Sequence, residues 1–454
     1  MNTLENLRKS LNVKVENGKK TLKHNINKKV NIFPFQTRNP ERAKFKNGFS
    51  PVIGQFFRNI EGVKLTVLEK EEFVKVLTNQ VNCSDEDRPH LVRIITSYLF
   101  QADTLRIFHP SIYKYIELSS SKEATGEKEI AQYIYDALLG GEATLFEEFL
   151  LQRKSEHVLS RLIIDNLPKL EHAKIENKYA PTLPFIRKLF LKDLQFLLTN
   201  REFFMQYINL FFAYYYFYSI TQMVLKINQF EKMDPYNPTP IYYNLDWERT
   251  SRNRPAVTHG YKHIFTNARK VLTHVNTLEH LNFIFDTENK HYIELVEEFN
   301  RLNPLEQQKI LDAIYTWTKE YTEIKVGNMD EIERKPQLEE AMRQLQQQIA
   351  KGLSQETLYR YALAVNEIGK AYFLKTRGSL GNTLNVTQDF LILLTAISVK
   401  DTKIPLNQYF KELENRGVFF DRYSQEEIIE LLNKLNLIEK KSDSGDAQYV
   451  KPIL

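Results

Sequence analysis

The chain has 454 residues, of which 62 are Lys or Arg and 57 are Asp or Glu, so its formal net charge is +5. Only 15 residues are glycine, which disfavours β-sandwiches and Rossmann-type folds because these need many tight turns or glycine-rich phosphate loops. A hydrophobic content of 42% excludes global disorder. The single cysteine, Cys83, excludes disulfides and cysteine-clustered metal sites and is typical of a reducing compartment. Composition therefore predicts a soluble, helix-rich, cytoplasmic protein.

Residues 1–50 are predicted to form a basic N-terminal arm. Residues 1–60 carry 13 Lys or Arg against 3 Asp or Glu, a net charge of +10, whereas the rest of the chain has a net charge of −5. Clustered cations attract a polyanion by releasing its counterions, so we expect contact with DNA or with an acidic partner surface. The alternative is a solvated, partly mobile arm. The candidate DNA-binding residues are Arg8, Lys9, Lys19, Lys20, Lys28, Lys29, Arg38, Arg42, Lys44 and Lys46.

Aromatic side chains lie between these cations. They would either stack on bases or anchor the arm to the rest of the protein. The four residues are Phe33, Phe35, Phe45 and Phe49.

Residues 51–325 are predicted to form a helical body, because their apolar residues recur mostly at helical spacing. Its most unusual segment, Phe203–Leu225, has no charged residue, and Phe203–Tyr218 holds ten aromatics in sixteen positions. That length permits a membrane span, which keeps a membrane-associated adaptor as one alternative function. The interspersed Gln, Asn, Ser and Thr residues and the many tyrosines favour a buried central helix and no membrane contact.

An ordered loop is predicted near residues 235–256, because four prolines interrupt any helix there. Arginines on a stiff loop can bind phosphates, and Trp247 can stack on a base. In the alternative interpretation the loop is an internal tether, in which Asp246 and Glu248 pair with nearby arginines and Trp247 fills the core. The candidate DNA-binding residues of this segment are Arg249, Arg252, Arg254 and Lys262.

Residues 326–378 are predicted to be a helical connector, and residues 379–454 a winged-helix-like domain. Helices are expected around Phe390–Ile397, Leu406–Glu414 and Gln425–Asn436, the last opened by a capping box of Ser424 and Glu427. A β-hairpin turning at Gly445 is expected to follow. The predicted fold class is therefore mainly α: a multi-helical body with a C-terminal module of three helices plus a β-hairpin.

The third helix of that module is acidic. A winged helix usually reads DNA with this helix, but carboxylates would repel phosphates, and Asp443 and Asp446 occupy the predicted wing tip. We therefore predict that the module docks on a partner protein, with DNA reading as the alternative. The candidate partner-binding residues are Arg422, Tyr423, Glu426, Glu427 and Glu430.

The sequence lacks a nucleotide-binding GxxxxGK[ST] loop, an HExxH motif and a nucleophile elbow. We predict no catalytic residue, metal or cofactor, although enzymatic activity stays open. The best local match to a metal-dependent nuclease is Glu288-Asn289-Lys290, if Phe283–Phe285 is a strand, so a cryptic nuclease is the second alternative. His259 and His263 are interpreted as ordinary surface histidines rather than metal ligands.

Two family-specific strings carry a resemblance. The loop YYNLDWERTSRNR after the aromatic segment FFAYYYFY, together with the tail that begins RGVFFDRYSQEEIIELL, resembles the DptG (DndG) family of DNA phosphorothioation-dependent restriction proteins. The resemblance is strongest over residues 203–263 and 378–454. It implies a non-catalytic scaffold and DNA-contacting subunit of an antiviral (antiphage) restriction complex. Its implied partners are DptF-like and DptH-like subunits, which resemble ATPases, and double-stranded DNA that lacks phosphorothioate.

Overall fold

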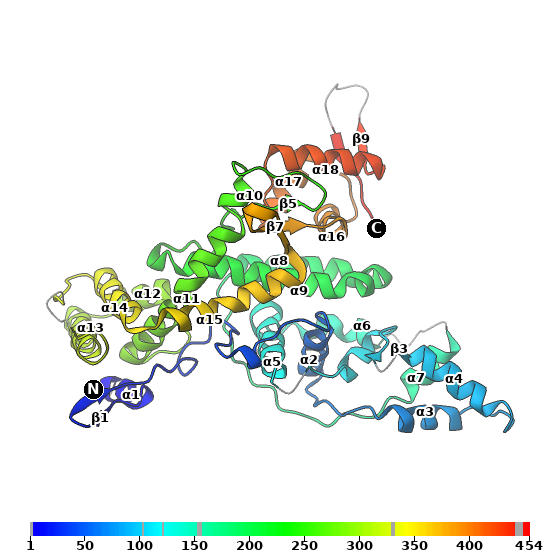
Figure 1. Cartoon of the computed structure of the whole chain (residues 1–454), viewed down its shortest axis with the longest axis horizontal. Helices are drawn as coiled ribbons and strands as arrows, with labels where there is room; N and C mark the ends of the chain where they lie inside the picture. Colours follow the sequence, from blue (N-terminus) through cyan, green and yellow to red (C-terminus); the bar gives the residue numbers. More distant parts are fainter. Residues whose placement is uncertain (1–2, 102–103, 120–121, 152–156, 328–331, 441–447) are drawn as a thin grey trace. The chain divides into compact units, whose positions relative to one another are not determined.

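The computed structural model describes residues 3–101, 104–119, 122–151, 157–327, 332–440 and 448–454 (Figure 1). The chain is mainly helical with small sheets, which confirms the predicted fold class. It divides into a larger unit (residues 1–39, 179–186 and 217–453) and a smaller unit (residues 40–178, 187–216 and 454). This division differs from the expected one, because the basic arm is split after Asn39 and the helical body is shared between both units.

The central element of the larger unit is a helix whose middle is buried on every side. This is α11 (Tyr261–Phe285), in which every residue from Val271 to Asn282 is buried. It packs against α1, α13, α14 and α15. Because it carries polar residues among these positions, their hydrogen bonds must be satisfied inside the protein. The neighbouring elements are α1 (Thr3–Ser10), β1 (Lys14–Glu16), β2 (Lys19–Thr21), α10 (Pro255–Thr258), α12 (Tyr292–Arg301), α13 (Pro304–Lys325), α14 (Leu338–Gly352) and α15 (Gln355–Ile368).

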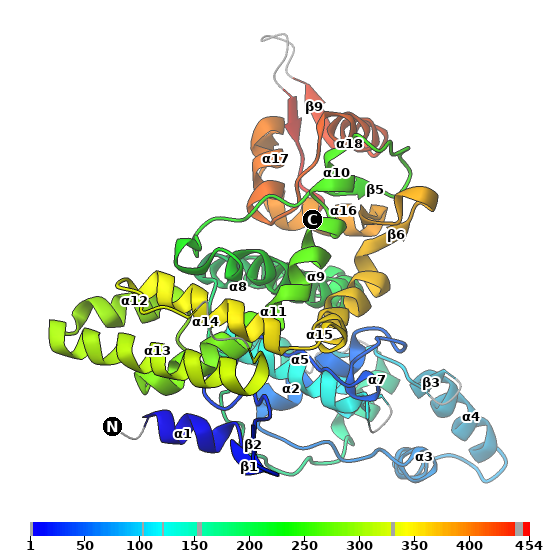
Figure 2. The ribbon, with the colours of Figure 1, turned by 60° about the vertical axis from the view of Figure 1, so that its left-hand side comes forward.

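The C-terminal part of the larger unit holds two small sheets and three helices. In the first sheet, β7 (Asn382–Val386) pairs in parallel with β5 (Asn244–Leu245) and antiparallel with β6 (Leu374–Thr376). The second sheet has the antiparallel order β8-β10-β9. Figure 2 shows the three helices grouped beside β9. The elements are α16 (Gln388–Val399), β8 (Ile404–Pro405), α17 (Leu406–Asn415), α18 (Arg422–Lys434), β9 (Ile438–Lys440) and β10 (Gln448–Val450).

Three helices and the strands of a closing hairpin were predicted for this region, whereas β8 was not. The winged-helix assignment itself stays a prediction. The predicted capping box is wrong, because α18 begins at Arg422 and its N-cap is Asp421, whose carboxylate accepts a hydrogen bond from the Ser424 N–H at 3.1 Å. Gly445, Asp443 and Asp446 lie outside the described residues.

The smaller unit consists of short helices and one two-stranded sheet. Its elements are α2 (Ser50–Glu61), α3 (Lys70–Asn79), α4 (Arg88–Leu99), β3 (Phe100–Gln101), β4 (Thr104–Leu105), α5 (Ala124–Tyr133), α6 (Glu147–Leu151) and α7 (Val158–Asp165). Two longer helices, α8 (Pro184–Leu198) and α9 (Arg201–Ile227), contribute residues to both units. Single 3-10 or π turns complete the chain at η1 (Asn39–Glu41), η2 (Pro110–Tyr115), η3 (Ile134–Leu139), η4 (Ala143–Phe146), η5 (Phe230–Lys232), η6 (Gly369–Phe373) and η7 (Gly378–Leu380).

The aromatic helix α9 is buried, as its composition predicts. Every residue from Phe211 to Ile227 is buried. Its tyrosine hydroxyls find partners inside the protein: Tyr215 donates to Asp193 at 2.6 Å, and Tyr218 donates to the Asn415 carbonyl at 2.8 Å. Over the part of the chain that the structure describes, no helix combines the length and the apolar character needed to cross a membrane.

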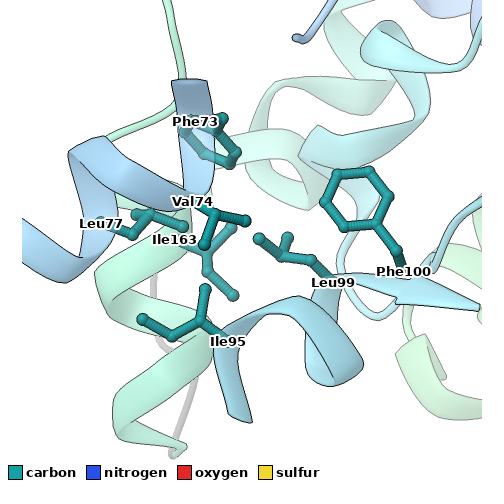
Figure 3. Close-up of a cluster of buried hydrophobic side chains, with 7 residues drawn as sticks. All are labelled: Phe73, Val74, Leu77, Ile95, Leu99, Phe100 and Ile163. Atoms are coloured by element: carbon teal, nitrogen blue, oxygen red, sulfur yellow. The ribbon is translucent and has the colours of Figure 1, made fainter. Parts of the chain in front are cut away.

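A separate apolar cluster joins α3, α4 and α7 in the smaller unit (Figure 3). The side chains point toward one another from the three helices and from β3. Isolated helices of this length are marginal in water, so their packing through this cluster is what stabilises them. The cluster comprises Phe73, Val74, Leu77, Ile95, Leu99, Phe100 and Ile163.

We expect Leu99→Ala to lower the free energy of unfolding of the smaller unit by about 2–5 kcal/mol, because it leaves a cavity at a fully buried position. Urea unfolding checks this value. The matched control is Ile94→Ala on the same helix, where the side chain is 51% exposed and the change is expected to stay within about 0.5 kcal/mol. Equal destabilisation by the two variants would contradict the importance of this cluster.

Candidate nucleic-acid interface

The basic arm is fixed to α11 through one buried carboxylate. The Glu279 side chain, with no exposed surface, accepts hydrogen bonds from three successive backbone N–H groups. Those of Lys28 and Lys29 lie 3.0 and 2.8 Å from Oε1, and that of Val30 lies 3.1 Å from Oε2. Burial raises the pKa of the Glu279 carboxyl, and the three hydrogen bonds work against that shift.

Further contacts hold the arm on both sides of this anchor. Asn289 accepts a hydrogen bond from the Asn31 N–H at 2.8 Å, and its own N–H donates to the Lys29 carbonyl at 2.7 Å. Nearer the start of the chain, the Arg8 guanidinium binds both oxygens of Glu320 at 2.7–3.1 Å. Residues 3–39 of the arm therefore form an ordered extension of the larger unit.

The aromatic residues of the arm serve as anchors. Phe33 and Phe35 are buried and stack with ring centroids 4.9 Å apart, and Phe35 meets the Tyr361 ring edge-on at 5.2 Å. In the smaller unit, Phe45 and Phe49 are also buried and stack on each other at 5.6 Å. Because their faces are covered by protein, base stacking by these four residues is excluded.

Two histidines lie where the arm meets α11 and α13. The His24 Nε2 atom is 2.7 Å from the Tyr321 hydroxyl, and the Trp317 indole N–H donates to His280 Nδ1 at 3.2 Å. Burial lowers the pKa of His24 to about 4, with a smaller effect from the Lys325 charge, and lowers that of His280 to about 3. Both imidazoles are therefore neutral near pH 7.

The cations of the arm fall into two groups. Arg8 and Lys29 form ion pairs with carboxylates of the same chain. Arg8 pairs with Glu320, and Lys29 Nζ lies 3.2 Å from Glu288. The predicted DNA contacts Lys9, Lys19, Lys20 and Lys28 are exposed.

Four exposed lysines of the arm lie on the hairpin β1-β2 or just after it. We name Lys14, Lys19, Lys20 and Lys23 the basic ribbon; all four are exposed, and Glu16 is the one acidic residue in residues 14–23. Lys20 Nζ lies 3.5 Å from Glu323, which leaves the other three lysines as the better phosphate ligands. Sequence reasoning missed Lys14 and Lys23 because it selected cations that occur in small groups, whereas the short hairpin around Asn17-Gly18 would have joined these isolated lysines to Lys19.

The later cations of the predicted arm do not form one set with the ribbon. Arg38 is exposed and belongs to the larger unit, whereas Arg42, Lys44 and Lys46 belong to the smaller one. Arg42 is only 3% exposed, so its prediction as a DNA contact is wrong. Lys44 Nζ lies 4.0 Å from Glu123, and Lys46 is exposed.

At Arg254 the loop is an internal tether, so the prediction of a phosphate contact at this residue is wrong. The buried guanidinium donates to Glu248 at 3.1 Å, to Asp421 at 2.7 Å and to the Ser424 hydroxyl at 2.7 Å. The two carboxylates offset the cost of burying the charge and connect the loop to the start of α18.

The other residues of the loop agree only in part with the two interpretations of the sequence. Asp246 pairs with Lys375 at 2.7 Å rather than with an arginine, and Trp247 is half-buried. The other predicted DNA contacts, Arg249, Arg252 and Lys262, are exposed.

The outer side of α18 is acidic and aromatic. Tyr423 is 64% exposed, and Glu426 and Glu430 are also exposed, whereas Glu427 is half-buried. Arg422 pairs with Glu426 at 2.9 Å, and Lys434 pairs with Glu430 at 2.6 Å, so each carboxylate is partly neutralised along the helix. The carboxylates of this surface would repel a phosphate backbone.

The geometry expected for a nuclease is absent at the predicted place. Phe283–Phe285 is the last turn of α11 rather than a strand, Glu288 binds the arm, and Lys290 Nζ lies 3.7 Å from Glu294. The prediction of a strand followed by an acid-x-Lys site is therefore wrong. Within the described ranges, no group of three or more His, Cys, Asp or Glu side chains is placed to hold a metal ion.

Comparison of the chain with protein-family models and with curated proteins gave no match.

The docking of the arm is expected to weaken as the pH falls from about 6.5 to about 4. Because the pKa of His24 is lowered in the folded protein, the unfolded chain takes up the proton first, and the contribution of neutral His24 is lost on acidification. The wild type should lose up to about 3 kcal/mol more unfolding free energy over this range than His24→Gln. Urea unfolding at a series of pH values measures the difference.

The exposed His90 provides the control, because His90→Gln removes a histidine outside the contact between His24 and Tyr321. If His24→Gln behaved like His90→Gln, the contact between His24 and Tyr321 would carry no pH-dependent stability.

Proposed function

We propose that this chain is a non-catalytic, DNA-contacting scaffold subunit of a phosphorothioation-dependent restriction complex, acting with ATPase partners similar to DptF and DptH on DNA that lacks the modification. The observation that carries the DNA contact is the basic ribbon, whose lysines project from an arm that is anchored elsewhere. The sequence strings that resemble the DptG family supply the biological setting.

The anchoring of the arm supports this role because, apart from the contact between Lys20 and Glu323, it uses other groups than the ribbon lysines. Backbone N–H groups, two buried phenylalanines and the Arg8–Glu320 pair hold the arm, so Lys14, Lys19 and Lys23 stay exposed. Lysines held on a fixed hairpin can bind successive phosphates without reading bases. Phosphorothioate modification also lies in the backbone, which is the part of DNA that such lysines contact.

A second surface suits the partner subunits. The exposed side of α18 offers Tyr423 beside Glu426 and Glu430, and the buried Arg254 guanidinium lies 5.2 Å from the Tyr423 ring. Exposed tyrosines are common anchors of protein interfaces, and a rigid base improves such an anchor. The DNA contact and the docking surface thus use different parts of the larger unit.

Removing the ribbon charge by Lys14→Ala, Lys19→Ala and Lys23→Ala together is expected to lower the affinity for a short duplex about tenfold or more. The slope of log affinity against log salt should fall by about 2 to 3, because each lost phosphate contact contributes about 0.9. Fluorescence anisotropy across a salt series with the full chain measures both quantities.

The matched control removes three exposed lysines of the smaller unit, Lys64, Lys75 and Lys128, and therefore lowers the net charge by the same amount. It should change the slope little. A ribbon variant with the slope of the wild type, or an equal loss in the control, would contradict the proposed DNA contact.

Combining Tyr423→Ala with Glu426→Gln and Glu430→Gln is expected to abolish recovery of the two large ATPase partners in a tagged purification from the host after nuclease treatment. Tyr236→Ala with Glu297→Gln and Glu298→Gln changes exposed or half-exposed residues elsewhere and should leave recovery intact. If the wild type lost its partners on nuclease treatment alone, DNA rather than α18 would be the bridge.

A further inference from the structure

The contact between α11 and α15 presents aromatic side chains to solvent. Tyr359 of α15 is 44% exposed and meets the half-buried Phe265 of α11 edge-on, with ring centroids 5.9 Å apart and planes at 89°. Phe265 in turn stacks on Tyr261 at 5.6 Å. Tyr359 thus contacts the protein through Phe265 and keeps 44% of its surface exposed.

Cations flank these rings on the same side of α11. Lys262, Phe265 and Arg269 follow one another at steps of three and four residues, which places them on one face of the helix. Lys262 and Arg269 are exposed and lie about 10 Å apart along the axis, given a rise of about 1.5 Å per residue. The Arg269 guanidinium is 5.9 Å from the Tyr359 ring.

The support of this face is rigid. The Tyr261 hydroxyl donates to the Asn366 side chain of α15 at 2.6 Å in a buried position, and α11 and α15 pack along each other, as Figures 1 and 2 show. Side chains held on packed helices keep their geometry better than those on loops. We name Lys262, Phe265, Arg269 and Tyr359 the stacking face.

The charge around the stacking face favours an anion. Lys262, Arg269 and Lys270 are exposed on α11. On α15 the exposed Glu356 is paired with Arg360, and Glu367 is half-buried. An aromatic ring flanked by exposed cations matches the chemistry of a nucleic-acid strand, whose bases stack on rings while its phosphates bind Lys and Arg.

We propose that the stacking face binds single-stranded DNA, with a base on the Tyr359 ring and phosphates on Lys262 and Arg269. The inference rests on the proposed function and extends it from duplex to single strand. In a duplex both faces of a base are covered by its neighbours in the stack, so a base can reach Tyr359 only in an unpaired strand. Base stacking is tolerant of sequence, so any unpaired strand qualifies.

The test compares Tyr359→Ala in the full chain with the wild type, using fluorescence anisotropy with labelled oligothymidine and with a duplex. Tyr359→Ala should weaken oligothymidine binding about fivefold or more, the loss measured for a stacked base, and leave duplex binding unchanged. Tyr359→Phe keeps the ring and should bind like the wild type. Tyr236→Ala, which removes a tyrosine that is 70% exposed in a loop away from α15, is the matched control.

Four results would overturn the inference: no oligothymidine binding by the wild type, unchanged binding by Tyr359→Ala, an equal loss in Tyr359→Phe, or an equal loss for the duplex. Any of these results would show that the stacking face does not bind single-stranded DNA, and a protein contact would then be the remaining interpretation of its exposed aromatic residues. The proposed function fails separately, because it depends on the response of duplex binding to the three ribbon lysines and not on Tyr359.

Discussion

The arrangement of the larger unit depends on the buried carboxylate of Glu279. A charge in the fully buried middle of α11 is costly unless hydrogen bonds replace its water, and here three backbone N–H groups of the arm do so. The dependence is mutual, because those N–H groups have no helix or sheet partner of their own and would otherwise be left unpaired. Docking of the arm and tolerance of Glu279 inside the core are therefore one interaction.

A second set of buried charges also joins distant segments of the chain, here in the C-terminal part of the larger unit. Glu248, Arg254 and Asp421 meet with the Ser424 hydroxyl, and Arg377 donates to the carbonyls of Leu245 and Glu248 at 2.6 and 2.8 Å. Such a network is strong only when all its members are present. It joins the loop, the β5-β7-β6 sheet and α18, so the position of Tyr423 on the outer surface is set by charges inside.

Local patterns were enough to predict much of the fold. Aromatic density and the absence of charge predicted the burial of α9, and three helices were predicted where α16, α17 and α18 lie. Local patterns did not predict whether each Lys or Arg side chain faces the solvent or the interior of the protein. Arg254 faces inward because Asp421 lies 167 positions later, and Arg8 is occupied by Glu320, 312 positions later. No short-range pattern reports such partners, so the sequence predicted Arg42 and Arg254 as surface contacts although both are buried.

The long reach of the arm contacts sets the order in which the protein can assemble during synthesis. Lys28, Lys29 and Val30 leave the ribosome 249–251 residues before the carboxylate that holds them. At about 5–20 residues per second, this interval is about 12–50 s. Throughout that time the cationic segment has neither Glu279 nor Glu320 to bind, and it is open to ribosomal RNA and to other polyanions nearby. Completion of α11 and α13 is therefore the event that supplies the partners of Arg8 and of the Lys28–Val30 backbone and fixes the arm in place.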